Sequence, residues 1–364
     1  MRLFLCKSCG QTLFFENNVC GRCGYALGFS ADTLSLLTLE TLEAGLQPLG
    51  GGQLFSYCRN AGHGVCNWLV PKAAAHLDGL CIACRHNQTI PDLTIDENLT
   101  AWRVTEIAKH RLFYSLLRLK LPLKNLADAP VLGFAFNFLS DPPEPGPRIL
   151  TGHNEGLITI NLKEADDAMR ERFRKEMGEP YRTLLGHFRH EIGHYYWNLL
   201  VRDGGRLQAC RAVFGDDTLD YAEALQTHYE QGPPPEWEQN YISAYASSHP
   251  WEDFAESWAH YLHIADTLET ASAFGLGIHP YRMDENLLHA DINFDPYKAK
   301  TVGQLIQAWL PLTFAMNALN RSMGHADSYP FVLSETVIGK LSFIHHLVQG
   351  QIGEEALKMP PAQV

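Results

Sequence analysis

The sequence lacks any long run of apolar residues. No stretch approaches the roughly 18 apolar residues that a membrane-spanning helix needs, which excludes a protein built from such helices. The first residues, Met1 to Cys6, are also far too short to be the apolar core of a secretory signal, which takes roughly 7–15 residues. We therefore expect a cytoplasmic protein with no membrane partner.

The chain also lacks a basic excess. Its 29 Lys and Arg face 41 Asp and Glu, a net charge of -12, and the acidic excess lies after the nearly neutral first 90 residues. A protein that binds nucleic acid non-specifically needs a basic stripe, and none is evident, so we expect no nucleic-acid partner. With 364 residues, 46% of them hydrophobic, the chain is long enough for two or three globular domains.

Cysteine is scarce after residue 84, where only Cys210 occurs, and we expect that side chain to be a buried small residue. The other eight lie in the first 84 residues, and Cys-x-x-Cys pairs occur among them. In a reducing compartment this spacing is typical of thiolate metal sites and not of a disulfide framework.

Cys6, Cys9, Cys20 and Cys23 form two such pairs around a strand-like run at residues 12–15. The glycines that follow each pair allow the turn that directs backbone amides at sulfur, so four thiolates can meet at one tetrahedral ion. This pattern predicts a zinc ribbon with a structural Zn²⁺.

A second, less regular quartet is predicted to bind another structural Zn²⁺. His63 and His76 could replace one of its members, Cys66, although we expect both to be loop residues. An iron–sulfur cluster fits the paired pattern less well. Four protein ligands close each site, so both would hold structure and perform no chemistry. The four cysteines of this quartet are Cys58, Cys66, Cys81 and Cys84.

The most informative stretch contains His190, Glu191 and His194 in the pattern His-Glu-Ile-Gly-His. On a helix the two histidines lie one turn apart on one face and can bind one Zn²⁺, while the glutamate activates a water molecule; this is the zincin protease signature. Pro180 suits the first helical position, and Gly204-Gly205 ends the helix. Apolar residues from Leu184 to Leu199 gather on the opposite, core-facing side. His187 is expected to line the cleft.

A catalytic zinc needs a third protein ligand and one open position. A helix opened by Pro250 places Glu252 and Glu256 on one face, and we predict that Glu252 binds the metal while Glu256 orients a liganding histidine. His249 and Asp253 are rival ligands that point elsewhere. His263 lies about three turns further along, so we expect a capping or surface role.

The remaining pattern predicts an α+β protein: zinc-ribbon modules at residues 1–90, then a mainly helical, zincin-like metallopeptidase domain with a small sheet at residues 91–364. The acidic segment 92–98 is the expected boundary, and the C-terminal third is expected to be all helical. His345-His346 is expected at the surface, and the strand before the metal helix is expected to be an edge that pairs with substrate. Helices are expected at 102–121, 163–177, 221–229, 303–323 and 335–349 (N-cap Ser334), strands at 131–139, 149–150 and 156–161, and a proline-rich loop at 141–147.

Taken together, these segments resemble the bacterial zinc-binding metallopeptidases that carry an N-terminal zinc ribbon. The resemblance spans nearly the whole chain and implies a zinc peptidase of the gluzincin type, with three zinc ions (one catalytic, two structural) and a peptide or protein substrate. It is carried by residues 58–68, 151–161, 181–197 and 248–258.

More remotely, residues 252–256 are similar to the glutamate-bearing helix of anthrax-lethal-factor-type proteases, in which a tyrosine seven residues before the first glutamate stabilises the oxyanion. Tyr245 occupies that place, and Tyr241 and His249 are close enough in sequence to compete for the role. The alternative function is a zinc-ribbon adaptor that uses a peptidase fold to bind a partner. In either case the ribbons could contact a protein.

Overall fold

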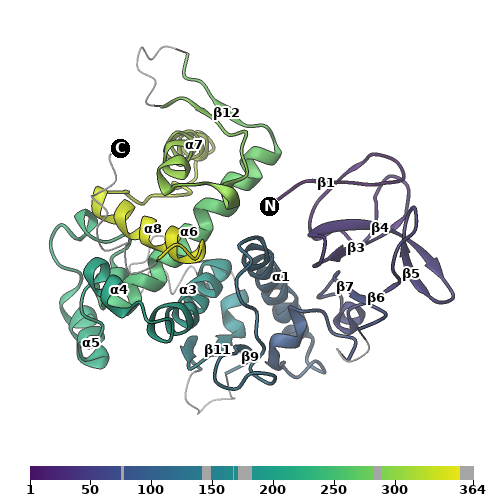
Figure 1. Ribbon diagram of the computed structural model, residues 1–364, viewed down its shortest axis with the longest axis horizontal. Helices are drawn as coiled ribbons and strands as arrows, with labels where there is room; N and C mark the ends of the chain where they lie inside the picture. Colours follow the sequence, from purple (N-terminus) through teal and green to yellow (C-terminus); the bar gives the residue numbers. More distant parts are fainter. Residues whose placement is uncertain (75–77, 142–148, 167, 171–182, 282–287, 353–364) are drawn as a thin grey trace. The chain divides into compact units, whose positions relative to one another are not determined.

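The structure is a computed structural model that describes residues 1–74, 78–141, 149–166, 168–170, 183–281 and 288–352. The chain divides into two compact units, Met1–Arg170 and Glu171–Val364 (Figure 1). The predicted domain boundary at residues 90–91 falls inside the first unit, and it stays a prediction. None of the described helices combines the length and hydropathy that crossing a bilayer requires.

The first unit begins with antiparallel strands. A short hairpin precedes a five-stranded sheet whose strands follow the order of the chain, and Leu39, Phe55 and Leu69 form its core. Our sequence analysis assigned no structure to residues 26–57, because these strands do not alternate cleanly between buried and exposed positions. The elements are β1 (Phe4–Leu5), β2 (Thr12–Leu13), β3 (Ala26–Ser30), β4 (Ser35–Leu42), β5 (Gly45–Pro48), β6 (Phe55–Tyr57) and β7 (Leu69–Pro71).

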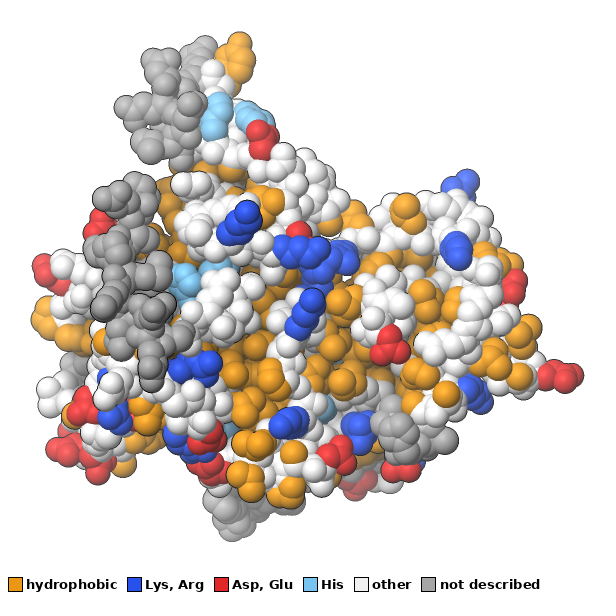
Figure 2. Space-filling view, in the orientation of Figure 1, with side chains coloured by type: hydrophobic (Ala, Val, Ile, Leu, Met, Phe, Trp, Pro, Cys, Tyr) orange, Lys and Arg blue, Asp and Glu red, His pale blue; other side chains and the backbone are white. Residues whose placement is uncertain are grey.

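Some apolar side chains of this N-terminal region are exposed. Leu5 is 66% exposed, Phe14 52% and Val19 49%, all within or beside the first two cysteine pairs. Figure 2 shows hydrophobic side chains on the surface of the part that carries β1 to β7. The small core of a ribbon cannot cover every apolar residue it contains.

The rest of the first unit is a long helix and a mixed sheet. Helix α1 (Asp96–Arg118) starts before the predicted position, since Asp96 and Glu97 stabilise its first turn. The sheet has the order β10-β11-β9-β8, with β9 parallel to both of its neighbours. Its strands are β8 (Asn87–Thr89), β9 (Ala135–Leu139), β10 (Gly152–Asn154) and β11 (Leu157–Asn161).

Three details of this region correct the sequence analysis. The predicted strand at 149–150 is wrong, because the hairpin strand begins at Gly152 and turns through Glu155 and Gly156, both with positive φ. The strand before the motif helix, β11, pairs on both sides, so the expected edge strand is wrong: the edges of this sheet are β10 and β8. Residues 162–165 form a 3₁₀ helix, while most of the proline-rich loop and most of the expected helix at 163–177 lie outside the described residues.

The second unit is mainly helical, as expected, although a short hairpin of β12 (Gly277–Ile278) and β13 (Ala290–Asp291) interrupts its C-terminal third, which is therefore not all helical. The expected cap on the last helix is confirmed, since Ser334 accepts the amide of Val337. The helices are α3 (Leu184–Tyr196), continued by a π-helix (Trp197–Arg202), α4 (Leu207–Phe214), α5 (Tyr221–Gln231), α6 (Pro250–Ala273), α7 (Val302–Ser322) and α8 (Glu335–Val348).

Helices α3 and α6 cross closely because Gly193 has no side chain. A β-carbon at this position would lie 3.1 Å from the Cα of Ala255 and 3.3 Å from the Cβ of Trp258, tighter than most packed contacts. Gly193, inside the His-Glu-Ile-Gly-His motif, therefore allows close packing of the two helices that carry the predicted ligands.

Candidate active site and thiolate clusters

The motif helix α3 is capped by Thr183, whose hydroxyl accepts the amide of Gly186 at 3.0 Å. The predicted first residue, Pro180, lies outside the described residues. The apolar stripe is mostly buried, with Leu185 and Leu199 half-buried, but His190 and His194 are also only 9% and 3% exposed. The sequence predicts a buried core face and an open cleft face on this helix, but the exposed fractions of the two faces do not differ in this way, because α6 packs beside the histidines.

Helix α6 begins at Pro250 and brings Glu252 to the two histidines. Its Oε2 lies 2.9 Å from His190 Nε2 and 3.4 Å from His194 Nε2, and the two nitrogens are 3.1 Å apart. Bonds of about 2.0–2.1 Å to a tetrahedral Zn²⁺ would place such donors about 3.3 Å from one another. The donor set and its spacing therefore fit one zinc ion, with a fourth position left for water or substrate.

His190 is held between two carboxylates one helical turn apart. Its Nδ1 donates to Glu256 Oε1 at 2.7 Å, because a carboxylate can only accept, and this orients the ring so that Nε2 faces Glu252. Ser243 in turn donates to Glu256 Oε2 at 2.6 Å. Such outer contacts fix the tautomer and orientation of a metal-binding imidazole.

The electrostatics reflect these close contacts. Burial lowers the pKa of His190, but Glu252 and Glu256 together raise it well above the ordinary value. Burial raises the pKa of Glu252, but His194 and His190 bring it well below its usual range. These opposed shifts show that His190 and Glu252, 2.9 Å apart, each favour the charged form of the other.

Glu191 lies on α3 between the histidines and is 8% exposed. Burial is the largest cause of its raised pKa, and Glu252 adds to it while the neighbouring histidines oppose it. A carboxylate with a raised pKa is a better proton acceptor near neutral pH than an ordinary glutamate.

Several tyrosines surround the site. The Tyr245 ring centre is 5.9 Å from that of His190, and burial raises the pKa of this tyrosine well above its usual value. Tyr221, at the start of α5, donates its hydroxyl to Glu252 Oε1 at 2.7 Å. The sequence analysis missed Tyr221, since no spacing links residues 31 positions apart. Tyr241 instead lies under Lys340, whose Nζ is 4.3 Å from the ring centre.

The rival ligands are occupied elsewhere. His249 caps α6, with Nδ1 accepting the amide of Trp251 at 3.1 Å and Nε2 lying 3.2 Å from the carbonyl oxygen of Leu219. Asp253 forms a buried ion pair with Lys340 at 2.6 Å. Neither side chain belongs to the group of described residues that can share a metal with the motif histidines.

Three further histidine predictions can be assessed. His263 does not cap a helix, since it lies in the middle of α6; it is half-buried, and its Nδ1 faces the guanidinium of Arg189 on α3. The expectation that His345 is at the surface is wrong: it is 0% exposed, and Tyr261 lies 3.0 Å from its Nδ1. His187 is half-buried on α3. A pair of adjacent histidines suggests a polar surface position, but on helix α8 the side chain of His345 points into the core.

The first cysteine quartet is brought together in the first unit. Its four sulfurs lie within 4.8 Å of one another, with 3.5 Å between Cys6 and Cys23 and 3.7 Å between Cys9 and Cys20. Sulfurs around a tetrahedral Zn²⁺ are about 3.8 Å apart. Thr38 on β4 donates to the sulfur of Cys6 at 3.8 Å, which explains a buried threonine in that strand.

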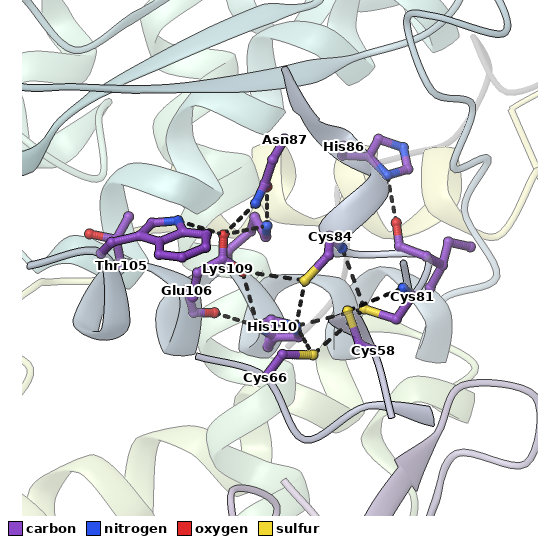
Figure 3. Close-up of polar contacts among 12 residues, drawn as sticks. Cys58, Cys66, Cys81, Cys84, His86, Asn87, Thr105, Glu106, Lys109 and His110 are labelled. Carbon is purple, nitrogen blue, oxygen red and sulfur yellow. Dashed lines mark hydrogen bonds and ion pairs between the residues drawn. The ribbon is translucent and has the colours of Figure 1, made fainter. Parts of the chain in front are cut away.

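The second quartet is also brought together (Figure 3). Cys66 and Cys81 are 3.8 Å apart, and backbone amides reach three sulfurs, those of Cys58 (from Cys81), Cys66 (from Trp68) and Cys81 (from Cys84), at 3.3–3.4 Å. The spacing fits a single ion. Of the suggested substitutes, His63 lies against Trp102 and His76 lies outside the described residues. The sequence analysis missed His110 and Glu106, two α1 residues beside this cluster.

Comparison with known proteins agrees with this architecture. A zinc-ribbon domain matches residues 3–95, and the family described as "Putative zinc-binding metallo-peptidase" matches residues 98–347. Uncharacterized proteins of Mycobacterium bovis and Mycobacterium tuberculosis are 44% identical over 349 residues, which cover 96% of this chain and 95% of theirs. No solved structure matches the chain significantly. The chain therefore belongs to the zinc-binding metallopeptidase family, with an N-terminal zinc ribbon.

Proposed function

We propose that the protein is a gluzincin-type zinc peptidase in which His190, His194 and Glu252 hold the catalytic Zn²⁺. The convergence of their three donor atoms, 2.9–3.4 Å apart, is the observation that carries this proposal. When bound, the ion would polarise the substrate carbonyl and acidify a water molecule. Peptide or protein amides are the proposed substrates, and two further zinc ions are assigned to the cysteine quartets.

The proton transfers belong to Glu191. Its carboxylate accepts a proton from the attacking water and returns it to the leaving amine, a role favoured by the pKa that burial raises. Tyr245 donates its hydroxyl to the carbonyl oxygen as negative charge develops there. Tyr221 holds Glu252, and Glu256 holds His190, so both keep the zinc-binding atoms in place.

The test is Glu191→Gln in the full chain. Because the amide cannot accept the proton, we expect peptide hydrolysis to fall by a factor on the order of 10²–10⁴ while zinc content is unchanged. Cleavage is measured on a proteome-derived peptide library by mass spectrometry, with zinc counted in the same preparation. Glu223→Gln, on exposed α5, is the matched control and should cleave like the parent. A Glu191→Gln enzyme as active as the parent would contradict the mechanism.

The adaptor function is favoured by one observation, the exposed Leu5, Phe14 and Val19 of the first ribbon, which could contact a protein partner. Native mass spectrometry separates the two functions. Three zinc ions per chain support the peptidase, whereas two ions, with the α3–α6 site empty, support the adaptor. A cytoplasmic location and the absence of a nucleic-acid partner stay predictions. The domain boundary at residues 90–91 is also a prediction, and it is supported by the two family matches, of which one ends at residue 95 and the other begins at residue 98.

A further inference from the structure

The second cysteine quartet has a fifth donor. His110 of α1 points its Nε2 at the cluster, 3.3 Å from the sulfur of Cys66, 3.8 Å from that of Cys84 and 4.0 Å from that of Cys81 (Figure 3). These three sulfurs form one face of the quartet, and Cys58 supplies the fourth sulfur. Among the described residues, the first quartet has no histidine in its donor group.

The orientation of His110 is that of a metal ligand. Its Nδ1 lies 2.6 Å from the carbonyl oxygen of Glu106, one turn earlier on the same helix. A carbonyl only accepts, so Nδ1 carries the proton and the lone pair of the neutral ring is on Nε2, facing the sulfurs. A backbone carbonyl on the other nitrogen is a common way to orient liganding histidines.

The distances accommodate a second tetrahedron. Bonds of about 2.3 Å to sulfur and about 2.0–2.1 Å to nitrogen give sulfur–nitrogen edges of about 3.6 Å and sulfur–sulfur edges of about 3.8 Å. The three His110 distances bracket the first value, and the 3.8 Å between Cys66 and Cys81 matches the second. The shared face can therefore be completed by Cys58 on one side or by His110 on the other.

Burial gives this choice an energetic basis. A divalent ion with four thiolates carries a charge of −2; replacing the Cys58 thiolate with the neutral His110 imidazole reduces it to −1 once the released Cys58 sulfur has taken up a proton from solvent. His110 is 4% exposed, and the nearby Lys109–Glu106 ion pair, 2.7 Å long, is fully buried and cancels its own charge. In such surroundings the site with less net charge costs less desolvation energy.

We propose that the second cluster holds zinc through Cys66, Cys81 and Cys84, with Cys58 and His110 as interchangeable fourth ligands. This proposal rests on the assignment of zinc to the quartet and not on the peptidase chemistry. Its consequence is that loss of the Cys58 thiolate does not empty the site. No such histidine joins the donor group of the first quartet in the part of the chain that the structure describes, so we expect no comparable reserve there.

A double-mutant cycle on the full chain tests this proposal. Cys58→Ala, His110→Phe and the double variant are compared; phenylalanine preserves the ring packing of His110 against Trp68. Zinc per chain is counted by native mass spectrometry, and affinity is measured by chelator competition. We expect each single variant to keep three zinc ions and the double variant to keep two. His110→Phe should weaken zinc binding by less than about tenfold in the parent and by more than a hundredfold in the Cys58→Ala background.

Two results would overturn the proposal. If His110→Phe weakens binding by the same factor in both backgrounds, the ring only supports the sulfurs, as an outer contact would at about 10–100-fold. If Cys58→Ala loses its zinc as fully as Cys6→Ala does in the first quartet, His110 is not a reserve ligand. Circular dichroism of each variant shows whether a lost ion reflects lost folding, and Cys81→Ala, which removes a shared ligand, should lose the ion in either case.

Discussion

The cysteine quartets and the α3–α6 site both gather donor atoms that could share one cation, but they do so in different ways. Each quartet draws four ligands from fewer than thirty residues of sequence, and backbone amides reach the sulfurs of the second. The α3–α6 site takes three donors from two helices and orients them with the side chains of Glu256, Ser243 and Tyr221. A closed site supported by backbone is suited to holding structure, whereas an open site supported by side chains can be tuned for chemistry.

The largest expected difference between the two kinds of site is in metal removal. A mild chelator should take the ion from the three-donor site first, because its fourth position is open, and abolish peptidase activity while two zinc ions remain. Adding zinc back should restore activity without refolding. Zinc counting and circular dichroism during titration provide the measurement. Simultaneous loss of all three ions, or loss from the quartets first, would break the comparison.

Support by side chains should also make the α3–α6 site sensitive to single outer changes. Glu256→Gln removes the carboxylate that accepts from His190 Nδ1, and an amide can present its NH₂ group there instead. We expect zinc affinity at this site to fall about 10–100-fold. Glu230→Gln on α5 is a matched control, since this carboxylate is exposed and contacts only Gln226 among the bonds described. Equal zinc affinity in both variants would show that Glu256 does not support the metal.

Tyr221 and Tyr245 are expected to have different roles in the site, one in metal binding and the other in catalysis. Tyr221→Phe removes the hydroxyl that donates to Glu252, so we expect weaker zinc binding, by about tenfold, and a nearly normal kcat once the enzyme is saturated with metal. Tyr245→Phe should leave zinc binding unchanged and lower kcat by roughly 10–100-fold, because its hydroxyl is used only as charge develops. Steady-state kinetics at controlled free zinc separates the two. If the effects are exchanged, Tyr221 is the oxyanion donor.

The same contrast, between donors close together in the sequence and donors brought together by packing, decides which parts of the molecule could be predicted from the sequence. The quartet cysteines and the motif histidines are local patterns, and Glu252 and Glu256 were found because a helical turn separates them. Tyr221 and His110 were missed because packing between distant segments brings them to their sites, and no spacing encodes that. The five-stranded sheet was missed for a similar reason. Thr38 of β4 is a polar residue that is buried next to a cysteine sulfur, so the sequence of β4 lacks the alternation of apolar and polar residues that identifies a strand.

The last expected effect concerns stability against pH, in the helix that carries Glu252. His260 on α6 is 5% exposed, and its Nδ1 is 2.8 Å from the hydroxyl of Tyr329. Burial is the main reason that its pKa falls to about 4; Arg189 and His190 lower it further, and Glu256 opposes them. The unfolded chain takes up this proton near pH 6.5, so the contribution of neutral His260 to stability is complete above that pH and is lost as the pH falls toward 4.

At pH 5 this loss amounts to roughly 2 kcal/mol, since one pKa unit corresponds to about 1.4 kcal/mol. His260→Gln keeps a polar partner for Tyr329 but cannot be protonated. Denaturant unfolding of the parent and the variant between pH 7 and pH 5 should show that the parent loses more stability, and taking the difference cancels every other titrating group. Parallel pH profiles would mean that His260 has the same pKa in the folded protein as in the unfolded chain. Since His260 lies one turn beyond Glu256, α6 would then accept a buried positive charge beside the metal site once the pH falls below about 6.5, and the side-chain support proposed for that site would be less finely balanced than the quartets are.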